Sequence, residues 1–347
     1  MPTDTTGPSG SARGVVSPAH ALARELWFTG PRAVEVRNGA LPPLRTGQVV
    51  ARALASGVSQ GTELLLYRGL GPTPFDPSLD ASGAPTYPRR YGYAWVGEVI
   101  ERAAGIDDAS VPAIGTRVFA LAPHGSRHVL EATALRPLDR AIPPRRAVLA
   151  ANLETAITCV WDAGISLGDR VVVLGGGVVG LLVARLATAS GGHVRLVEPS
   201  TRRRGVAAAL GIVAVSPDQD EPCADADVVV EATGDPRVLE RAIEHAAREA
   251  AIVVASFYGS RTAPVPLGAD FHRRRLRLVA TQVSSLPPSH APRWTFGRRF
   301  DLVRSLLAEP ALDALIDPPC RFEDAVAVYE RLDRSPGDAV QTVFEYE

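Results

Sequence analysis

The chain has 347 residues, of which 46% are hydrophobic and 22% are charged, and its formal net charge is −1. This length and apolar content allow two globular units with sizeable cores and exclude general disorder. The nearly neutral charge offers no electrostatic footprint for nucleic acid or for an anionic membrane, so the expected partner is a small-molecule substrate.

All 37 basic residues are arginine, and the sequence contains no lysine. A Walker-type phosphate loop needs a lysine on the phosphates, and pyridoxal enzymes need a lysine amine for their Schiff base. Both classes are therefore excluded, whatever the origin of the bias.

Residues 1–21 are rich in Thr, Gly, Ser and Pro and lack the apolar core of a signal peptide, so they are expected to form a flexible leader. No later apolar run reaches the length of a membrane span. The cysteines are few, widely spaced and odd in number, which predicts reduced thiols and a cytoplasmic location; they are Cys159, Cys223 and Cys320.

The first half of the chain, from about residue 25 to residue 137, predicts an irregular, mostly β domain. Short β-like pieces are separated there by clusters of Gly and Pro. The expected strands are Val34–Arg37, Gln48–Ala55, Trp95–Arg102 and Arg117–Leu121.

From Ala151 onward the pattern changes to alternating strands and helices, which predicts a parallel, doubly wound sheet. Its Val- and Ile-rich strands are nearly continuous apolar runs, as expected where helices cover both faces. The expected strands are Val171–Leu174, Val194–Glu198, Val228–Ala232 and Ile252–Phe257, and the expected helices are Leu181–Ser190, Arg202–Leu210 and Pro236–Ala247.

The end of the chain is expected to return to the first domain through helices at Phe300–Leu307 and Glu323–Leu332. The basic run His272–Arg277 leads into the apolar stretch Leu278–Thr281 and is interpreted as a charged edge before a core strand. The predicted organisation is a leader (1–21), a catalytic domain (22–152 and 286–347) and a dinucleotide-binding domain (153–285).

The segment Val171–Gly180 (VVVLGGGVVG) sets three glycines in GxGxxG spacing between a strand and a helix. Gly175 allows the tight turn, Gly177 lets a pyrophosphate approach the backbone, and Gly180 lets helix and strand pack closely. Val178 and Val179 complete this turn. Together with the absence of lysine, it predicts a dinucleotide cofactor.

Glu198, at the end of the second strand, can accept hydrogen bonds from both hydroxyls of an adenosine ribose, which favours NAD. Three arginines follow within one helical turn at Arg202, Arg203 and Arg204. They are either a solvated helix face or a cradle for a 2′-phosphate, so NADP stays open.

Several segments resemble the medium-chain dehydrogenase/reductase superfamily along nearly the full length after the leader. The segment Gly57–Glu63 (GVSQGTE) looks like the family's GVCGTD, with one extra residue, and Tyr91–Glu98 (YGYAWVGE) looks like its PGHE-x-x-G-x-V segment. Ala163–Asp169 (AGISLGD) and Val228–Gly234 (VVVEATG) resemble the approach to the cofactor strand and the fourth cofactor-domain strand. The resemblance implies a GroES-like, mostly β catalytic domain followed by a Rossmann domain.

Within the superfamily, Gly57–Glu63 together with Phe119–His124 (FALAPH) is most similar to the bacteriochlorophyllide hydroxyethyl dehydrogenase-like branch, which oxidises a secondary alcohol on a bulky ring substrate. Zinc-bearing members hold the metal with a cysteine, a histidine and a further cysteine or glutamate. Those places carry Ser59 or Gln60, Tyr93 and Ala151 here, a set that cannot form a tetrahedral zinc site. The chain is therefore expected to work without zinc.

Without a metal, a side chain must handle the charge on the substrate oxygen. The resemblance places Thr62 at the family's proton-relay hydroxyl and Tyr93 at the vacated histidine position. We expect both to contact the substrate oxygen, with Glu63 or His124 completing a path to solvent. Turn capping by Thr62 and space filling by Tyr93 are the alternatives.

The resemblance also places Thr155 against the nicotinamide, and Thr233 and Gly234 beside the cofactor. It implies a homodimer or homotetramer formed through the cofactor domains. The leading interpretation is a zinc-free alcohol dehydrogenase or carbonyl reductase. A reductase of conjugated C=C bonds or quinones and a non-catalytic dinucleotide-binding sensor remain open, and a methyltransferase fits less well because of the β-rich first half.

Overall fold

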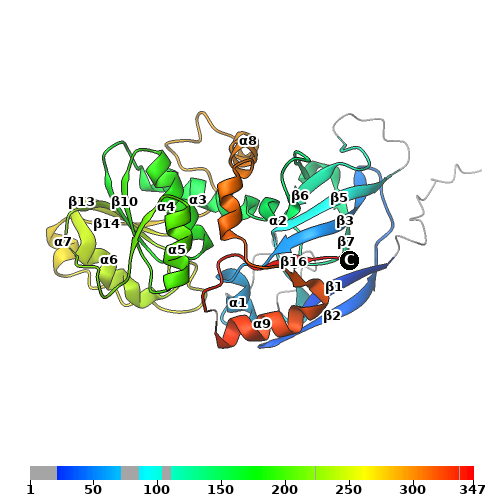
Figure 1. Cartoon of the computed structure of the whole chain (residues 1–347), viewed down its shortest axis with the longest axis horizontal. Coiled ribbons are helices and arrows are strands. Elements are labelled where there is room, and N and C mark those ends of the chain that lie inside the picture. Colours follow the sequence, from blue (N-terminus) through cyan, green and yellow to red (C-terminus); the bar gives the residue numbers. More distant parts are fainter. Residues whose placement is uncertain (1–21, 72–85, 104–110, 223, 336) are drawn as a thin grey trace, which may run out of the picture.

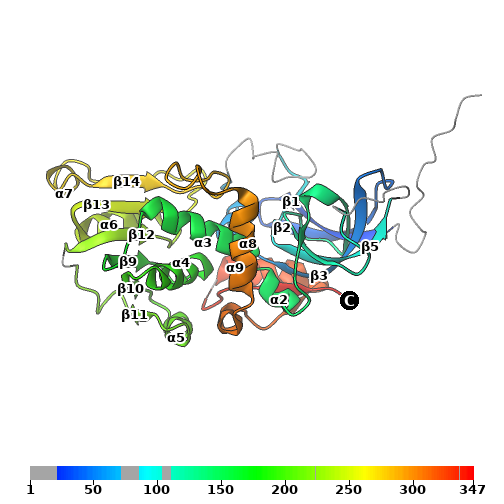
Figure 2. The same ribbon diagram turned by 90° about the horizontal axis from the view of Figure 1, so that it is seen from above.

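The computed structural model describes residues 22–71, 86–103, 111–222, 224–335 and 337–347 (Figure 1). The expected leader and Cys223 lie outside these ranges. Two lobes are joined where helix α8 (Phe296–Leu307) stands between them in both views (Figures 1 and 2). One lobe is β-rich, and the other is built on a parallel sheet with helices.

The β-rich lobe contains a three-stranded sheet, β2-β1-β4, and a seven-stranded sheet, β15-β16-β3-β5-β6-β8 with β7 also pairing with β3. The last strand, β16, runs antiparallel to β3 and pairs Val343 with Gly57. The bounds are β1 (Leu22–Gly30), β2 (Ala33–Ala40), β3 (Gln48–Gly57), β4 (Arg89–Arg90), β5 (Trp95–Arg102), β6 (Arg117–Ala120), β7 (Arg127–Glu131), β8 (Arg136–Pro137), β15 (Cys320–Arg321) and β16 (Val343–Glu345).

The second lobe is a six-stranded parallel sheet in the order β11-β10-β9-β12-β13-β14. The order reverses beside β9, and in open parallel sheets of this kind ligands bind at the carboxyl ends of the strands at such a point. The bounds are β9 (Arg170–Leu174), β10 (His193–Val197), β11 (Val213–Val215), β12 (Ala226–Glu231), β13 (Ala246–Val254) and β14 (Arg277–Ala280).

Alternate side chains of β9 face opposite layers of helix, as a sheet covered on both faces requires. Val171 and Val173 belong to the core shared with α3 and α4, whereas Val172 and Leu174 belong to the core shared with α6. The remaining helices are α1 (Thr62–Tyr67), α2 (Pro144–Ala147), α3 (Ala150–Ala163), α4 (Val178–Ala189), α5 (Thr201–Ala209), α6 (Leu239–His245), α7 (Asp270–Arg273) and α9 (Ala325–Arg334).

The predicted fold class is therefore confirmed: a β-rich domain is followed by a Rossmann-type sheet, and the chain returns to the β-rich domain at its end. The expected domain boundary between residues 152 and 153 falls inside α3. In the described residues, no helix is long and apolar enough to span a bilayer.

Local predictions were wrong at α6 and at β14. The helix expected over Pro236–Ala247 ends at His245, because Ala246 is already extended and pairs with Ala226 in the sheet. The strand after the basic run is not a core strand: β14 lies at the sheet edge, and Leu278 is 43% exposed. Apolar residues alone did not distinguish an edge strand from a central one.

We expect His128 to make the stability of the β-rich domain depend on pH. Its buried ring lies edge-on to Trp95, with centroids 5.1 Å apart, and hydrogen-bonds the carbonyl of Pro123 through Nε2 at 2.9 Å. Burial, assisted by the charge of Arg90, lowers the pKa of His128 to about 4. The folded protein therefore keeps this ring neutral at a pH where the unfolded chain protonates it.

We expect the free energy of unfolding to fall by about 3 kcal/mol through this group as pH drops from 7 to 4. The sign follows because the unfolded imidazole binds a proton from about pH 6.5 downward and the folded one does not. Urea titrations at both pH values measure the loss. His128→Gln should lose less stability over the same range, and an unchanged loss would contradict the assignment.

Candidate functional site

The glycine turn joins the end of β9 to the start of α4, and its three glycines have different surroundings. Gly175 has φ +100°, in the left-handed region that favours glycine. A Cβ on Gly180 would lie 1.9 Å from the carbonyl oxygen of Gly175, so no side chain fits there. A Cβ on Gly177 would meet nothing within 4 Å, so the space above the turn is open.

Gly177 is also the N-cap of α4, with Val178 and Val179 in the first turn. The first amides of a helix lack partners within the helix and carry its partial positive charge. An open backbone with such donors fits the pyrophosphate of a dinucleotide. The residues predicted to bind the pyrophosphate thus lie together at the carboxyl end of β9.

Glu198 immediately follows β10 and lies against this turn, only 2% exposed. One carboxylate oxygen accepts the N–H of Gly176 at 2.6 Å, and the other accepts the N–H of Ser200 at 2.8 Å. These bonds fix the carboxylate beside the pyrophosphate end of the turn. Its predicted contact with the ribose hydroxyls of an adenosine stays a prediction.

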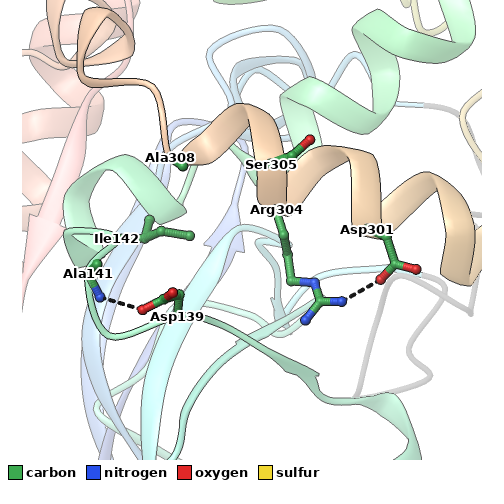
Figure 3. A pocket seen from close by; sticks show the side chains of 7 residues that line it. All are labelled: Asp139, Ala141, Ile142, Asp301, Arg304, Ser305 and Ala308. Atoms are coloured by element: carbon green, nitrogen blue, oxygen red, sulfur yellow. Dashed lines mark hydrogen bonds and ion pairs between the residues drawn. The ribbon is translucent and has the colours of Figure 1, made fainter.

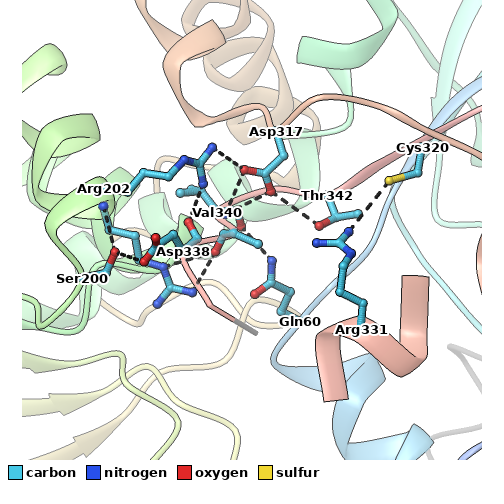
Figure 4. A network of polar contacts seen from close by, with 11 residues as sticks. Gln60, Ser200, Arg202, Asp317, Cys320, Arg331, Asp338, Val340 and Thr342 are labelled. Carbon is cyan, nitrogen blue, oxygen red and sulfur yellow. Dashed lines mark hydrogen bonds and ion pairs between the residues drawn. The ribbon is translucent and has the colours of Figure 1, made fainter. Parts of the chain in front are cut away.

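The three arginines after Glu198 have partners within the protein, although Arg202 is also exposed. Arg202 donates to Asp317 at 2.8 Å and to the carbonyl of Asp338, and Arg203 donates to the carbonyl of Ala339 at 2.7 Å (Figure 4). Arg204 donates to the carbonyls of Glu198 and Pro199 at 2.8 and 2.7 Å. Arg202 and Arg203 thus reach across to the C-terminal part of the β-rich domain.

Thr233 and Gly234 follow β12 beside the glycine turn, where a Cβ on Gly175 would lie 2.9 Å from the Cα of Thr233. The backbone N–H and the hydroxyl of Thr233 both donate to Glu231, whose carboxylate is fully buried. Tyr258 donates to the same carboxylate, and burial together with this bond raises the pKa of Tyr258. Glu231 therefore holds the end of β12 in shape.

Thr155 lies on α3, where its hydroxyl donates to the carbonyl of Ala151 at 3.0 Å. Gly234 donates its N–H to the hydroxyl of Ser256 at 2.8 Å. The first contact lies within α3, and the second joins the segment after β12 to the segment after β13. They leave the expected contact of these residues with the nicotinamide as a prediction.

Ser59, Thr62 and Tyr93 form a hydroxyl cluster. The sequence resemblance matches Ser59 or Gln60 and Tyr93 to metal-ligand positions of zinc-bearing members, and Thr62 to their proton relay. The phenol of Tyr93 donates to the Ser59 hydroxyl at 2.5 Å and lies 3.4 Å from the Thr62 hydroxyl. Burial raises the pKa of Tyr93 above its ordinary value, so the phenol is protonated at neutral pH. The structure thus brings Thr62 and Tyr93 together.

Glu63 and His124 are joined in a separate buried network. Glu63, fully buried, accepts the N–H of Ser59 at 2.9 Å, a bond from His124 Nε2 at 3.0 Å, and the phenol of Tyr329. The other ring nitrogen of His124 is 2.6 Å from the hydroxyl of Ser56. Every polar atom of the carboxylate is therefore engaged, as a buried charge requires.

His124 is only 1% exposed, so neither Glu63 nor His124 reaches solvent by itself. A proton path to solvent through His124 would continue to the hydroxyl of Ser56. That hydroxyl lies 2.6 Å from the phenol oxygen of Tyr346. Between Tyr93 and Glu63 the connection passes through the backbone N–H of Ser59, which does not carry protons. These contacts favour a positioning role for Glu63 and His124.

The third position for a metal ligand is Ala151, a buried methyl group. A hydroxyl, a phenol and a methyl group do not provide the nitrogen and sulfur donors of a tetrahedral zinc site. Elsewhere in the described ranges, no group of three or more His, Cys, Asp or Glu side chains is arranged to hold a metal ion. Cys159 is buried, and burial raises the pKa of its thiol to about 12, so the thiol is protonated at neutral pH.

A surface hollow of about 320 Å³ lies between α8 and the segment that precedes α2 (Figure 3). It is lined by Asp139, Ala141, Ile142, Asp301, Arg304, Ser305 and Ala308. Arg304 pairs with Asp301, and Asp139 accepts the N–H of Ala141. None of the cofactor or hydroxyl-cluster residues lines this hollow, so it is not the candidate site.

Sequence reasoning did not find several residues that shape the site. Tyr329 is 266 positions from the Glu63 carboxylate that it contacts, and Asp338 is 138 positions from Ser200. Such contacts have no local signal. Glu231 could have been noticed, because an acid at the end of a buried strand needs partners.

Comparisons with known proteins agree with this geometry. Residues 166–258 match the family described as "Putative NAD(P)-binding". Over 266 residues, the chain is 31% identical to 2-desacetyl-2-hydroxyethyl bacteriochlorophyllide A dehydrogenase of Cereibacter sphaeroides, covering 73% of this chain and 80% of the relative. It is 24% identical over 348 residues to D-guloside 3-dehydrogenase of Escherichia coli, covering 92% and 98% of the two chains.

Among solved structures, 2R,3R-butanediol dehydrogenase from Bacillus subtilis has the same fold, with a TM-score of 0.76 and 19% identity over 93% of this chain and 99% of that chain. The glycine turn, the parallel sheet and the named relatives together define an NAD(P)-dependent oxidoreductase. The chain belongs to the medium-chain dehydrogenase/reductase superfamily, and its relatives include the bacteriochlorophyllide hydroxyethyl dehydrogenase-like branch.

Proposed function

We propose that this chain is a zinc-independent, NAD-preferring dehydrogenase that transfers hydride between the nicotinamide and a secondary alcohol or its ketone. The observation that carries the proposal is the hydroxyl cluster, in which the phenol of Tyr93 contacts the hydroxyls of Ser59 and Thr62. The resemblance matches Tyr93 and Ser59 or Gln60 to metal-ligand positions, and Thr62 to the proton relay. The relatives named above are dehydrogenases of alcohol groups, which supports the reaction class.

The glycine turn and Glu198 would hold the dinucleotide, which supplies the hydride acceptor or donor at C4 of its nicotinamide. The chain itself must stabilise the substrate oxygen as charge develops on it. Tyr93 does this by donating a hydrogen bond, because its raised pKa keeps the phenol protonated at neutral pH. Phenols and alcohols can each donate and accept, so the Ser59 hydroxyl can donate back to Tyr93 when the phenol turns to substrate.

Thr62 lies within 3.4 Å of the same phenol and can either support Tyr93 or contact the substrate oxygen directly. Glu63 and His124 position the loop that carries the cluster, because Glu63 binds the N–H of Ser59. We expect NAD to be favoured over NADP, because the carboxylate of Glu198, held beside the glycine turn by Gly176 and Ser200, would accept the ribose hydroxyls.

The reaction is tested by incubating the protein with NADH or NADPH and panels of ketones, enones and quinones, followed by product analysis. Alcohols formed from ketones support the proposal. Saturated ketones formed from enones, with no reduction of isolated ketones, would instead identify a C=C reductase. Coenzyme binding without turnover on any panel would identify a non-catalytic sensor.

Coenzyme preference is tested separately by titrating the protein with NADH and NADPH and following nicotinamide fluorescence. We expect tighter binding of NADH, because the Glu198 carboxylate accepts ribose hydroxyls and repels a 2′-phosphate. A clear preference for NADPH would overturn this part of the proposal while leaving the reaction class intact.

A further inference from the structure

Glu198, Ser200 and the first turn of α5 form what we call the adenosine corner of the cofactor domain. The C-terminal segment of the β-rich domain contacts this corner. Asp338 accepts a hydrogen bond from the hydroxyl of Ser200 at 2.5 Å, and its carbonyl accepts from Arg202 (Figure 4). The neighbouring carbonyl of Ala339 accepts two bonds from Arg203, at 2.7 and 3.2 Å. The side chain of Asp338 is exposed, so the carboxylate faces the solvent side of this corner.

Asp338 is connected to the ribose-binding acid through one residue. Ser200 donates its backbone N–H to Glu198 at 2.8 Å and its hydroxyl to Asp338. Ser200 also caps α5 by accepting the N–H of Arg203 at 3.1 Å. Two carboxylates therefore flank the first turn of α5, one from each domain, beside the position where NADP carries its additional phosphate.

The arginines that could neutralise such a phosphate already have partners from the other domain. Arg202 is bound to Asp317, which is itself fixed by the N–H of Val340 at 3.1 Å. Arg203 donates to the carbonyl of Ala339, and its guanidinium Nη1 lies 3.8 Å from the carboxylate of Glu198. A fork-like contact of either guanidinium with a phosphate would require breaking these bonds.

We propose that Asp338 is a coenzyme-specificity residue: it excludes the 2′-phosphate of NADP by adding a second negative charge beside Glu198 and by keeping Ser200 engaged. The proposal deepens the NAD preference proposed above and rests on it. Selectivity at the adenosine ribose is thus shared between the cofactor domain and the C-terminal segment of the catalytic domain.

The test measures the affinities of NADH and NADPH for the full-length chain carrying Asp338→Asn. Binding is detected by nicotinamide fluorescence, and no substrate is present. Removing one charge close to a dianion predicts roughly tenfold tighter NADPH binding, with NADH unchanged within about twofold. The gain should shrink as salt is raised, because the carboxylate is exposed. Asparagine retains a side-chain oxygen for Ser200, so the fold at this corner is kept.

Glu330→Gln is the matched control: it removes an exposed carboxylate of α9 that pairs with Arg334 rather than with Ser200. It should leave binding of both coenzymes unchanged. Suppose that the wild type prefers NADH, but that Asp338→Asn changes the ratio of NADPH affinity to NADH affinity by less than about twofold. The role of Asp338 is then wrong, and the NAD preference stands. If wild type itself prefers NADPH, both fail.

Discussion

Gly177→Val is expected to weaken NADH binding by about 100-fold or more without unfolding the protein. The backbone at Gly177 has φ −68° and ψ 176°, which valine adopts without strain, and a Cβ there meets no protein atom within 4 Å. The added methyl groups would instead fill the open space above the turn, where the pyrophosphate binds. Isothermal titration with NADH and thermal melting measure the two effects.

Gly205→Val is the matched control, because a Cβ at this exposed position of α5 also meets nothing within 4 Å. It should bind NADH like wild type. Gly180→Ala should both weaken NADH binding and lower the melting temperature, unlike Gly177→Val. The reason is that its Cβ would lie 1.9 Å from the carbonyl oxygen of Gly175. Tight NADH binding by Gly177→Val would mean that the glycine turn does not hold the dinucleotide.

Tyr93→Phe is expected to lower the rate of hydride transfer by about 10² to 10³-fold, with binding of NADH unchanged. Phenylalanine keeps the packing of the ring and removes only the hydroxyl that contacts Ser59 and Thr62. Single-turnover kinetics with a ketone substrate measure the hydride-transfer step directly. Thr62→Ala should lower the same rate by a smaller factor, since its hydroxyl lies 3.4 Å from the phenol.

The pH profile adds a second readout for Tyr93. Because its pKa is raised above that of an ordinary tyrosine, wild-type ketone reduction should be level between pH 6 and 9 and fall only as the phenol ionises at higher pH. The residual activity of Tyr93→Phe should lack that alkaline fall. Tyr67→Phe, which alters a buried phenol of the same domain, is the control. Turnover near wild type in both Tyr93→Phe and Thr62→Ala would exclude the proposed role of the cluster.

The cofactor half of the site could be predicted from sequence because its residues are close together along the chain. The turn from Gly175 to Gly180 is continuous, and Glu198 follows one strand later, so hydrophobic periodicity and glycine spacing were sufficient. The start of α4 was still misplaced by three residues: it begins at Val178, because Gly177 acts as its N-cap and Gly180 lies inside the helix.

The catalytic half was predicted in part. The resemblance to relatives placed Thr62 and Tyr93 in one site, and the structure brings their hydroxyls to 3.4 Å. The sequence could not show that Ser59 stands between Tyr93 and Glu63, or that Tyr329 closes the network around Glu63. These contacts join strands and helices that are distant in sequence, and their geometry depends on packing of the whole domain.

The contacts between domains were also beyond the sequence. A cluster from Arg202 to Arg204 is compatible with a phosphate site, a solvated face or internal pairing, and composition does not distinguish them. The structure shows internal pairing, because Asp317, Asp338 and Ala339 return to this corner at the end of the chain. These contacts join the two domains beside Glu198.

The most direct test of the account is turnover of a secondary alcohol with NAD⁺ by protein that has been treated with a strong zinc chelator and shown by elemental analysis to contain no zinc. The hydroxyl cluster of Ser59, Thr62 and Tyr93 predicts the same turnover before and after treatment, and no gain when zinc is added. Loss of turnover on chelation, with recovery on adding zinc, would contradict the account.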